Sequence, residues 1–156
     1  MAYYTIPEFE GKVCGQRLIW ETAGELVYLE PYGKNAIRFR SSKSLHIDEE
    51  LNWTLLPAQK VSEVQIHMDK ERGQIVNGKI TAEITGDGTV TYYRTNTREI
   101  LLEESWVDGR VHTAPLRRAR EYRVTSGNQF RMSLYFREQA DEHFYGMGQD
   151  ANDCFD

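Results

Sequence analysis

The fold is decided by the run Ile80-Thr81-Ala82-Glu83-Ile84-Thr85-Gly86-Asp87-Gly88-Thr89-Val90-Thr91-Tyr92-Tyr93-Arg94. On both sides of the central Gly-Asp-Gly, side chains alternate in character with a period of two, as they do in a strand with one buried face. Glycines around an aspartate supply the positive φ angles that a tight turn needs. The run therefore predicts a β-hairpin with strands over 80–85 and 89–94.

The same alternation recurs along most of the chain. Phe130, Met132, Leu134 and Phe136 share one face of a predicted strand, and the polar residues between them share the other. Further strands are predicted over Val64–Met68, Gln16–Trp20, Glu25–Glu30, Ala36–Arg40, Arg98–Glu103 and Arg120–Thr125. Turn signals separate them at Ala23-Gly24, Pro31–Asn35, Arg72-Gly73, Asn77-Gly78, Val107–Gly109 and Ser126–Asn128. Nine or ten short strands of this kind predict an all-β fold, an antiparallel β-sandwich.

One short helix is predicted over Asp48–Leu56, with Asp48 as its cap and Trp53, Leu55 and Leu56 turned inward. The chain contains no internal repeat and no linker, so residues 1–156 are expected to form a single domain. A domain of this length buries roughly 70% of the surface that its unfolded chain exposes, and it is too short for a (β/α)8 barrel of about 250 residues.

Charge and composition exclude several function classes. The 19 basic residues are outnumbered by 24 acidic ones, and the net charge is −5. Binding to nucleic acid or to an anionic membrane surface requires a basic excess, so neither partner is expected. The sequence shows no signal peptide and no apolar run long enough to span a bilayer, and Cys14 and Cys154 are expected to be reduced thiols of a cytoplasmic protein.

The acidic and histidine residues suggest little chemistry. Asp48-Glu49-Glu50 and Glu103-Glu104 are sequence neighbours, and neighbours on a strand point to opposite faces, which is a poor arrangement for a catalytic carboxylate pair. His46-Ile47-Asp48 and His67-Met68-Asp69 could each supply two metal ligands, but no further residues complete a zinc site, so no metal is expected. His112 and His143 add no cluster.

No nucleophile or phosphate loop is apparent. No serine lies in a Gly-x-Ser-x-Gly elbow, and Gly86-x-Gly88 lacks the third glycine of a dinucleotide site, so no cofactor is expected. The chain contains three tryptophans, Trp20, Trp53 and Trp106, with nine tyrosines and six phenylalanines. Such rings either fill a sandwich core or form a platform on which sugars stack, and composition leaves both alternatives open.

The segment 141–149, Asp-Glu-His-Phe-Tyr-Gly-Met-Gly-Gln, resembles the Phe-Tyr-Gly-x-Gly-Glu/Gln signature of family 31 glycoside hydrolases, which include α-glucosidases and α-xylosidases. Three earlier pieces resemble the family in the same order along the chain, namely Asn35–Arg40, Asn77–Ile84 and Ile100–Glu104. The signature residues in this chain are Phe144, Tyr145, Gly146, Met147, Gly148 and Gln149.

The resemblance implies the N-terminal domain of such an enzyme, a galactose-mutarotase-like β-sandwich that packs against a (β/α)8 barrel. In the family the barrel carries two catalytic aspartates and hydrolyses α-glycosidic bonds with retention. Neither catalytic motif occurs here, and Trp106-Val107-Asp108-Gly109 is similar to the nucleophile motif only superficially, since its Asp-Gly is better explained as a turn. We therefore expect a fragment of a longer polypeptide that carries no catalytic residue, with an incomplete sandwich.

Three hypotheses about function follow. The first is a non-catalytic sandwich that docks on the barrel of the same chain and helps to shape the site for an oligosaccharide or α-glycoside substrate. In that role the signature residues 144–149 would mark the junction between the sandwich and the barrel. The second hypothesis is a stand-alone carbohydrate-binding module, and the third is a self-contained sugar mutarotase with a histidine acid and a glutamate base. The exposed sheet edges of a truncated sandwich are also expected to make the fragment dimerise.

Overall fold

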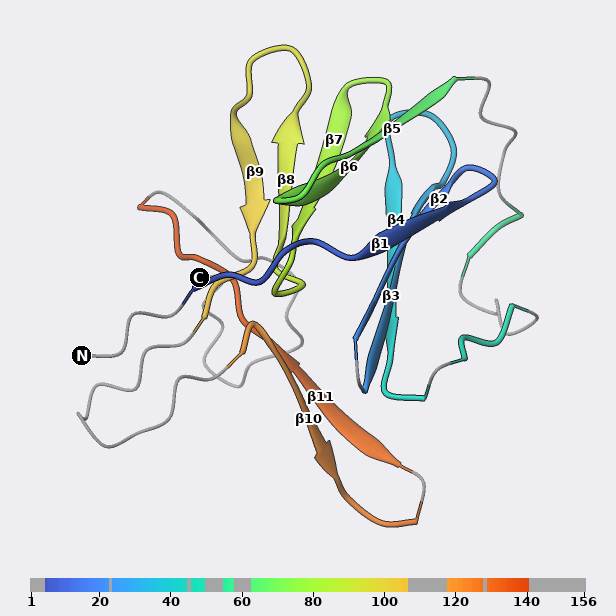
Figure 1. The fold of residues 1–156 in the computed structure, drawn as a ribbon, viewed down its shortest axis with the longest axis vertical. Coiled ribbons are helices and arrows are strands. Elements are labelled where there is room, and N and C mark those ends of the chain that lie inside the picture. The colour runs from blue at the N-terminus through green and yellow to red at the C-terminus, as the bar shows by residue number, and fades with distance from the viewer. Residues whose placement is uncertain are drawn as a thin grey trace, which may run out of the picture.

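The computed structural model describes residues 5–22, 24–44, 46–49, 55–57, 63–106, 118–127 and 129–140. In these residues the chain forms three antiparallel sheets and no helix (Figure 1), which confirms the predicted all-β sandwich. The four-stranded sheet contains, in spatial order, β1 (Gly11–Cys14), β2 (Arg17–Thr22), β3 (Glu25–Pro31) and β4 (Ile37–Ser42). The five-stranded sheet contains β5 (Val64–Met68), β6 (Arg72–Asn77), β7 (Ile80–Thr85), β8 (Val90–Arg94) and β9 (Ile100–Glu103). A separate hairpin consists of β10 (Arg120–Val124) and β11 (Phe130–Leu134).

The predicted central hairpin is confirmed as β7 and β8, which pair with Ile84 opposite Val90. Its turn is closed by the amide of Gly88, which donates to the carbonyl of Thr85 at 2.8 Å. The Asp87 carboxylate accepts hydrogen bonds from the Thr85 hydroxyl at 2.6 Å and from the Thr89 amide at 3.1 Å. Gly88 has a φ of +82°, and a Cβ there would lie 2.4 Å from the Trp20 ring. This glycine is therefore required both by the backbone and by the packing of the core.

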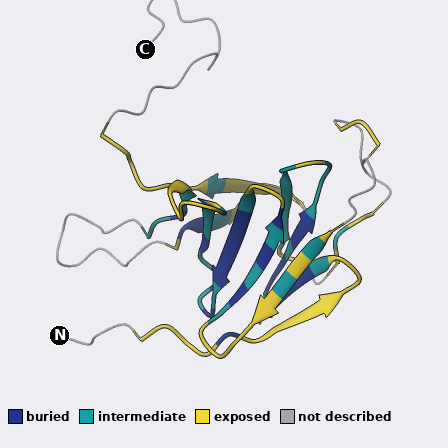
Figure 2. Ribbon diagram, turned by 90° about the horizontal axis from the view of Figure 1, so that it is seen from above, coloured by how far each residue is buried: buried dark blue, intermediate teal, exposed yellow. Residues whose placement is uncertain are grey.

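The core lies between the four-stranded and five-stranded sheets, and the buried residues concentrate on the central strands (Figure 2). Leu18 and Trp20 of β2 and Val27 and Leu29 of β3 face the inner residues of β6, β7 and β8, which are Ile75, Ala82, Ile84 and Val90. All eight are essentially inaccessible to solvent. Phe9 enters the same core from the segment before β1. Alternating apolar residues on two sheets that face each other thus account for the sandwich.

Two asparagines link the two sheets at one end of the sandwich. The side-chain amide of Asn77, at the end of β6, donates to the carbonyls of Gly33 at 2.8 Å and Ala36 at 2.7 Å. The side-chain oxygen of Asn35 in turn accepts from the Lys79 amide at 2.8 Å. Asn35 has a φ of +57°, a conformation that asparagine tolerates better than most residues. These bonds hold the β3–β4 turn against the β6–β7 turn.

The structure corrects three details of the predicted elements. Arg72-Gly73, predicted as a turn, lies inside β6, because the Asp69 carboxylate accepts the amides of Glu71 at 2.7 Å and Arg72 at 2.9 Å and places the turn earlier. Strands β1 and β6 were not predicted at all. The ends of the predicted helix, 48–49 and 55–56, are not helical and Leu56 is 84% exposed, while 50–54, with Trp53, lie outside the described residues.

Candidate functional site

The structure does not describe the residues of the sequence signature. Residues 144–149 lie outside the described ranges, as do His112, His143 and Cys154. His46 and His67 are described and both are exposed. Within the described part of the chain, no three His, Cys, Asp or Glu residues come together as metal ligands.

A deeply buried charged group is the side chain of Arg120, at the start of β10. Its Nε donates to Oε1 of Glu25 at 2.6 Å, its Nη1 donates to Oε2 of Glu104, and its Nη2 donates to the carbonyl of Gly88 at 2.6 Å. The side chains of Arg120, Glu25 and Glu104 are only 4%, 6% and 3% exposed. These three residues, which we call the Arg120 cluster, join the separate hairpin to both sheets of the sandwich.

Alternation along the strands explains why these side chains meet. Glu25 opens β3 and lies on the same face as Val27 and Leu29, so its carboxylate points toward the interior. Glu104 follows β9 immediately, and its Oε2 also accepts the amide of Val90 at 2.8 Å. Glu103 has its carboxylate 3.2 Å from Arg137 instead, which confirms the prediction that these neighbouring glutamates point to opposite faces.

Burial and opposite charge act against each other in the Arg120 cluster. Burial alone would lower the pKa of Arg120, but the negative charges of Glu104 and Glu25 and their hydrogen bonds outweigh it and raise that pKa. Burial raises the pKa of Glu104, against the pull of Arg120 and of the Val90 amide. Arg120 therefore stays charged, and both carboxylates depend on it for their stability inside the protein.

The geometry of the Arg120 cluster is unsuited to glycoside cleavage. Retaining cleavage requires two carboxyl groups about 5 Å apart, flanking a bond that a substrate can present to them. Glu25 and Glu104 converge on one guanidinium, and the cavity beside them has a volume of only about 10 Å³. A second acidic pair, Glu30 and Glu49, is likewise held by an arginine, since Arg40 contacts both within 3.0 Å. We assign both pairs a structural role.

The hairpin of β10 and β11 extends away from the two sheets (Figure 1) and exposes a row of apolar side chains. Val124 is paired with Phe130, and Met132 and Leu134 follow on the same face, as the sequence predicted. Together with Phe136, which continues this alternation, they form what we call the hairpin face. Its members Val124, Phe130, Met132, Leu134 and Phe136 are 69%, 50%, 39%, 42% and 44% exposed.

The base of the hairpin is fixed to the sandwich. The amide of Ser105 donates to the carbonyl of Tyr135 at 2.9 Å, and the amide of Arg137 donates to the carbonyl of Glu103 at 2.8 Å. The Tyr122 hydroxyl hydrogen-bonds with Ser41 on β4. With the Arg120 cluster, these bonds hold the hairpin face in a defined direction. An apolar row that is both exposed and held in place is typical of a docking surface.

Neither of the two described tryptophans presents a fully exposed ring on which a sugar could stack. Trp20 is buried in the core, and the Trp106 indole is half-buried and donates to the Thr89 hydroxyl at 3.2 Å. Several tyrosines carry a cation over one ring face, with Arg17 lying 4.4 Å from the centre of the Tyr28 ring and Arg98 lying 4.3 Å from that of Tyr93. These cations compete with a sugar for the rings.

Comparison with known proteins finds similarity both to a protein sequence and to a solved structure, and no protein-family model matches the chain. The chain is 29% identical to a protein of Pseudescherichia vulneris described as an uncharacterized family 31 glucosidase, in an alignment that covers 83% of this chain and 26% of the relative. Its fold is similar to that of a family 31 α-xylosidase from a soil metagenome, solved in complex with xylose, with a TM-score of 0.78 and 29% identity over 90% of this chain and 22% of that one.

These comparisons confirm the resemblance to family 31 glycoside hydrolases that the sequence motifs indicated. The chain spans about a quarter of the length of either relative. The motif pieces 35–40 and 77–84 also contact each other in the structure, through the bonds of Asn35 and Asn77. The two motif pieces therefore share a structural role, because each supplies one half of the link between the two sheets.

Proposed function

We propose that this relative of family 31 glycosidases is a non-catalytic β-sandwich that docks through its hairpin face on the catalytic part of a longer polypeptide. The observation that carries the proposal is the hairpin face itself. Four exposed apolar side chains lie on one face of a two-stranded hairpin and Phe136 lies just beyond it, and such a hairpin is marginally stable in water without further packing. The relatives are about four times longer, so they contain ample polypeptide to cover the equivalent surface.

The activity of the longer polypeptide is proposed to be hydrolysis of α-glucosides or α-xylosides, with the reacting carboxylates outside residues 1–156. The names of the two relatives, a glucosidase and an α-xylosidase, support this substrate class. The arginine-bound carboxylates of the described residues support the absence of catalysis here, because a carboxylate held by a guanidinium at close range is a poor nucleophile and a poor acid.

An activity assay tests the catalytic part of the proposal. Purified protein of residues 1–156 should release no nitrophenol from aryl α-glucoside or aryl α-xyloside, while the longer polypeptide should release it from at least one of them. Turnover by the 156-residue chain would reject the proposal. Its loss or retention after the Glu25→Gln and Glu30→Gln substitutions would then show whether the described carboxylates carry it.

Paired substitutions in the longer polypeptide test the docking part. Met132→Lys places a charge in the hairpin face, whereas Ser133→Lys places the same charge on the opposite face of the same strand. We expect Met132→Lys to lower the melting temperature and the activity, because a buried unpaired lysine is costly. Ser133→Lys should change neither. Equal effects of the two substitutions would show that the hairpin face is not covered.

A further inference from the structure

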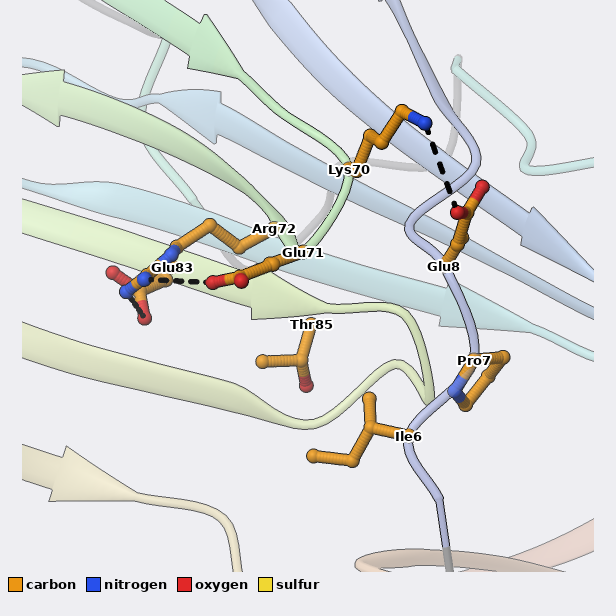
Figure 3. Close-up of a pocket in the computed structure, with 8 residues that line it drawn as sticks. All are labelled: Ile6, Pro7, Glu8, Lys70, Glu71, Arg72, Glu83 and Thr85. Carbon is orange, nitrogen blue, oxygen red and sulfur yellow. Dashed lines mark hydrogen bonds and ion pairs between the residues drawn. The ribbon is translucent and has the colours of Figure 1, made fainter.

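The outer side of the five-stranded sheet carries a groove of about 590 Å³ (Figure 3). Its floor is formed by Arg72 of β6 and by Glu83 and Thr85 of β7. One wall is the segment 6–8 that precedes β1, and the other is the turn at residues 70–71. The groove lies on the face of the sheet opposite to the core. None of the residues that line it belongs to the hairpin face.

Both walls of the groove are anchored. On the first wall, the Pro7 carbonyl packs so closely on Gly86 that a Cβ at position 86 would lie 1.9 Å from it. Phe9, two residues later, inserts its ring into the core and donates its amide to the carbonyl of Lys70 at 2.8 Å. On the second wall, the Asp69 carboxylate accepts two turn amides. The groove is therefore built into the fold and does not depend on a ligand for its shape.

The floor presents a fixed arrangement of planar polar groups. The Glu83 carboxylate accepts from Gln74 at 2.5 Å and from Arg72 at 3.1 Å, and its side chain is 8% exposed. The Arg72 guanidinium also donates to Glu71 at 3.3 Å. Planar guanidinium and carboxylate groups side by side can exchange paired hydrogen bonds with neighbouring hydroxyl groups. Ile6 and Pro7 add an apolar surface on the wall, next to Thr85 in Figure 3.

Several ligand classes fit this groove poorly. Its charged residues are three glutamates, one lysine and one arginine, a near balance that favours neither a polyanion nor a polycation. Its floor is the face of β6 and β7, which are both central strands, so no strand edge is available to pair with a peptide. No group of three potential metal ligands occurs in the described residues.

We propose that this groove binds a neutral carbohydrate of one or two sugar units. The hydroxyl groups of the sugar would bond to Arg72, Glu71 and Lys70, and its C–H face would pack on Ile6 and Pro7. The volume lies within the range of about 300–1,000 Å³ that small ligands occupy. Because no aromatic ring lines it, binding is expected to be weak, with a Kd of roughly millimolar order. The choice of sugar probes rests on the proposed function.

Amide chemical shifts of isotope-labelled protein, titrated with maltose or with methyl α-xyloside, test this inference. Saturable shifts are expected at the amides of residues 6, 8, 70–72 and 83–85. Lys70→Ala and Glu71→Ala, whose side chains are 85% and 80% exposed and whose removal should leave the fold intact, should each weaken binding about fivefold. Glu99→Ala, at an exposed ion pair outside the groove, is the matched control and should leave the affinity unchanged.

Three outcomes would overturn the inference. The shifts could fail to saturate, they could arise equally with the acyclic polyol mannitol, or they could be insensitive to Lys70→Ala and Glu71→Ala. None of these outcomes bears on the hairpin face, which the titration does not perturb. Failure of the groove therefore remains distinguishable from failure of the proposed docking function.

Discussion

Replacing Arg120 by methionine should be among the most damaging single changes in the described part of the chain. Methionine fills a similar volume but leaves Glu25 and Glu104 buried without their cation. Removing one partner of a buried ion pair costs about 3–5 kcal/mol, because the remaining charge is uncompensated. For a domain of this size, each kcal/mol lowers the melting temperature by about 2–4 °C, so Arg120→Met should lower it by roughly 6–20 °C.

Urea unfolding followed by tryptophan fluorescence measures this cost, with Arg123→Met as the control. Arg123 lies three residues further along β10, and its side chain is 57% exposed in a surface pair with Glu121. A surface pair contributes about 0–1 kcal/mol, so the control should unfold almost as the unchanged protein does. If Arg120→Met does not fold, Arg120→Lys supplies a milder form, since it keeps the charge and loses the three-way hydrogen bonding.

A triple variant separates charge from packing. Arg120→Met combined with Glu25→Gln and Glu104→Gln removes the cation and both carboxylates together, so at least about half of the lost free energy of unfolding should return. An Arg120→Met protein as stable as Arg123→Met would refute the reasoning. So would a triple variant less stable than Arg120→Met alone, because the damage would then come from lost packing.

Three further predictions concern other parts of the molecule. Asn77→Ala removes two buried hydrogen bonds and should lower the free energy of unfolding in urea by about 2 kcal/mol, and a loss below about 0.5 kcal/mol would contradict the link between the sheets. Partial burial acts to raise the pKa of Glu49, but hydrogen bonds from Arg40 and Arg17 lower it on balance. This stabilisation of the folded protein is therefore present above the ordinary pKa of 4.5 and is lost as the pH falls through the lower pKa of the folded state. Glu49→Gln should therefore reduce the drop in melting temperature between pH 6 and pH 3.5. An equal drop in the variant and in the unchanged protein would count against this prediction. The 156-residue chain should associate at high concentration and Phe130→Lys should reverse this, while a monomer at every concentration in sedimentation would argue against an adhesive hairpin face.

The fold could be predicted from the sequence where a local pattern and a tertiary contact agree. The hairpin around Gly86-Asp87-Gly88 is the strongest example, since the same residues that form the turn also close it through the Asp87 side chain. The sequence pattern predicts this turn at Arg72-Gly73, because glycine is a common turn residue, whereas the turn lies before β6 in the structure. In the structure Gly73 provides room for the Phe9 ring, a contact that no local pattern shows.

The Arg120 cluster and the groove could not be derived from the sequence. Glu25, Glu104 and Arg120 are separated along the chain, and they come together only because the three sheets pack against one another. One signal was available: Arg120 alternates with Tyr122 and Val124 along its strand, and a charged residue in such an alternation needs a partner if its end of the strand is buried. The identity of that partner, however, required the structure. The apolar face of β11 could be predicted from the alternation of apolar and polar residues, but the alternation does not show that this face is exposed.

Hydrogen exchange of the β11 amides tests the central claim most directly, by comparing the 156-residue chain with the longer polypeptide. If the hairpin face docks on the catalytic part, the amides of Phe130, Met132 and Leu134 should exchange at least about a hundredfold more slowly in the longer polypeptide, because local opening would then require undocking. The core amides of β7 serve as the internal reference and should change little. Equal exchange of β11 in both proteins would contradict the account.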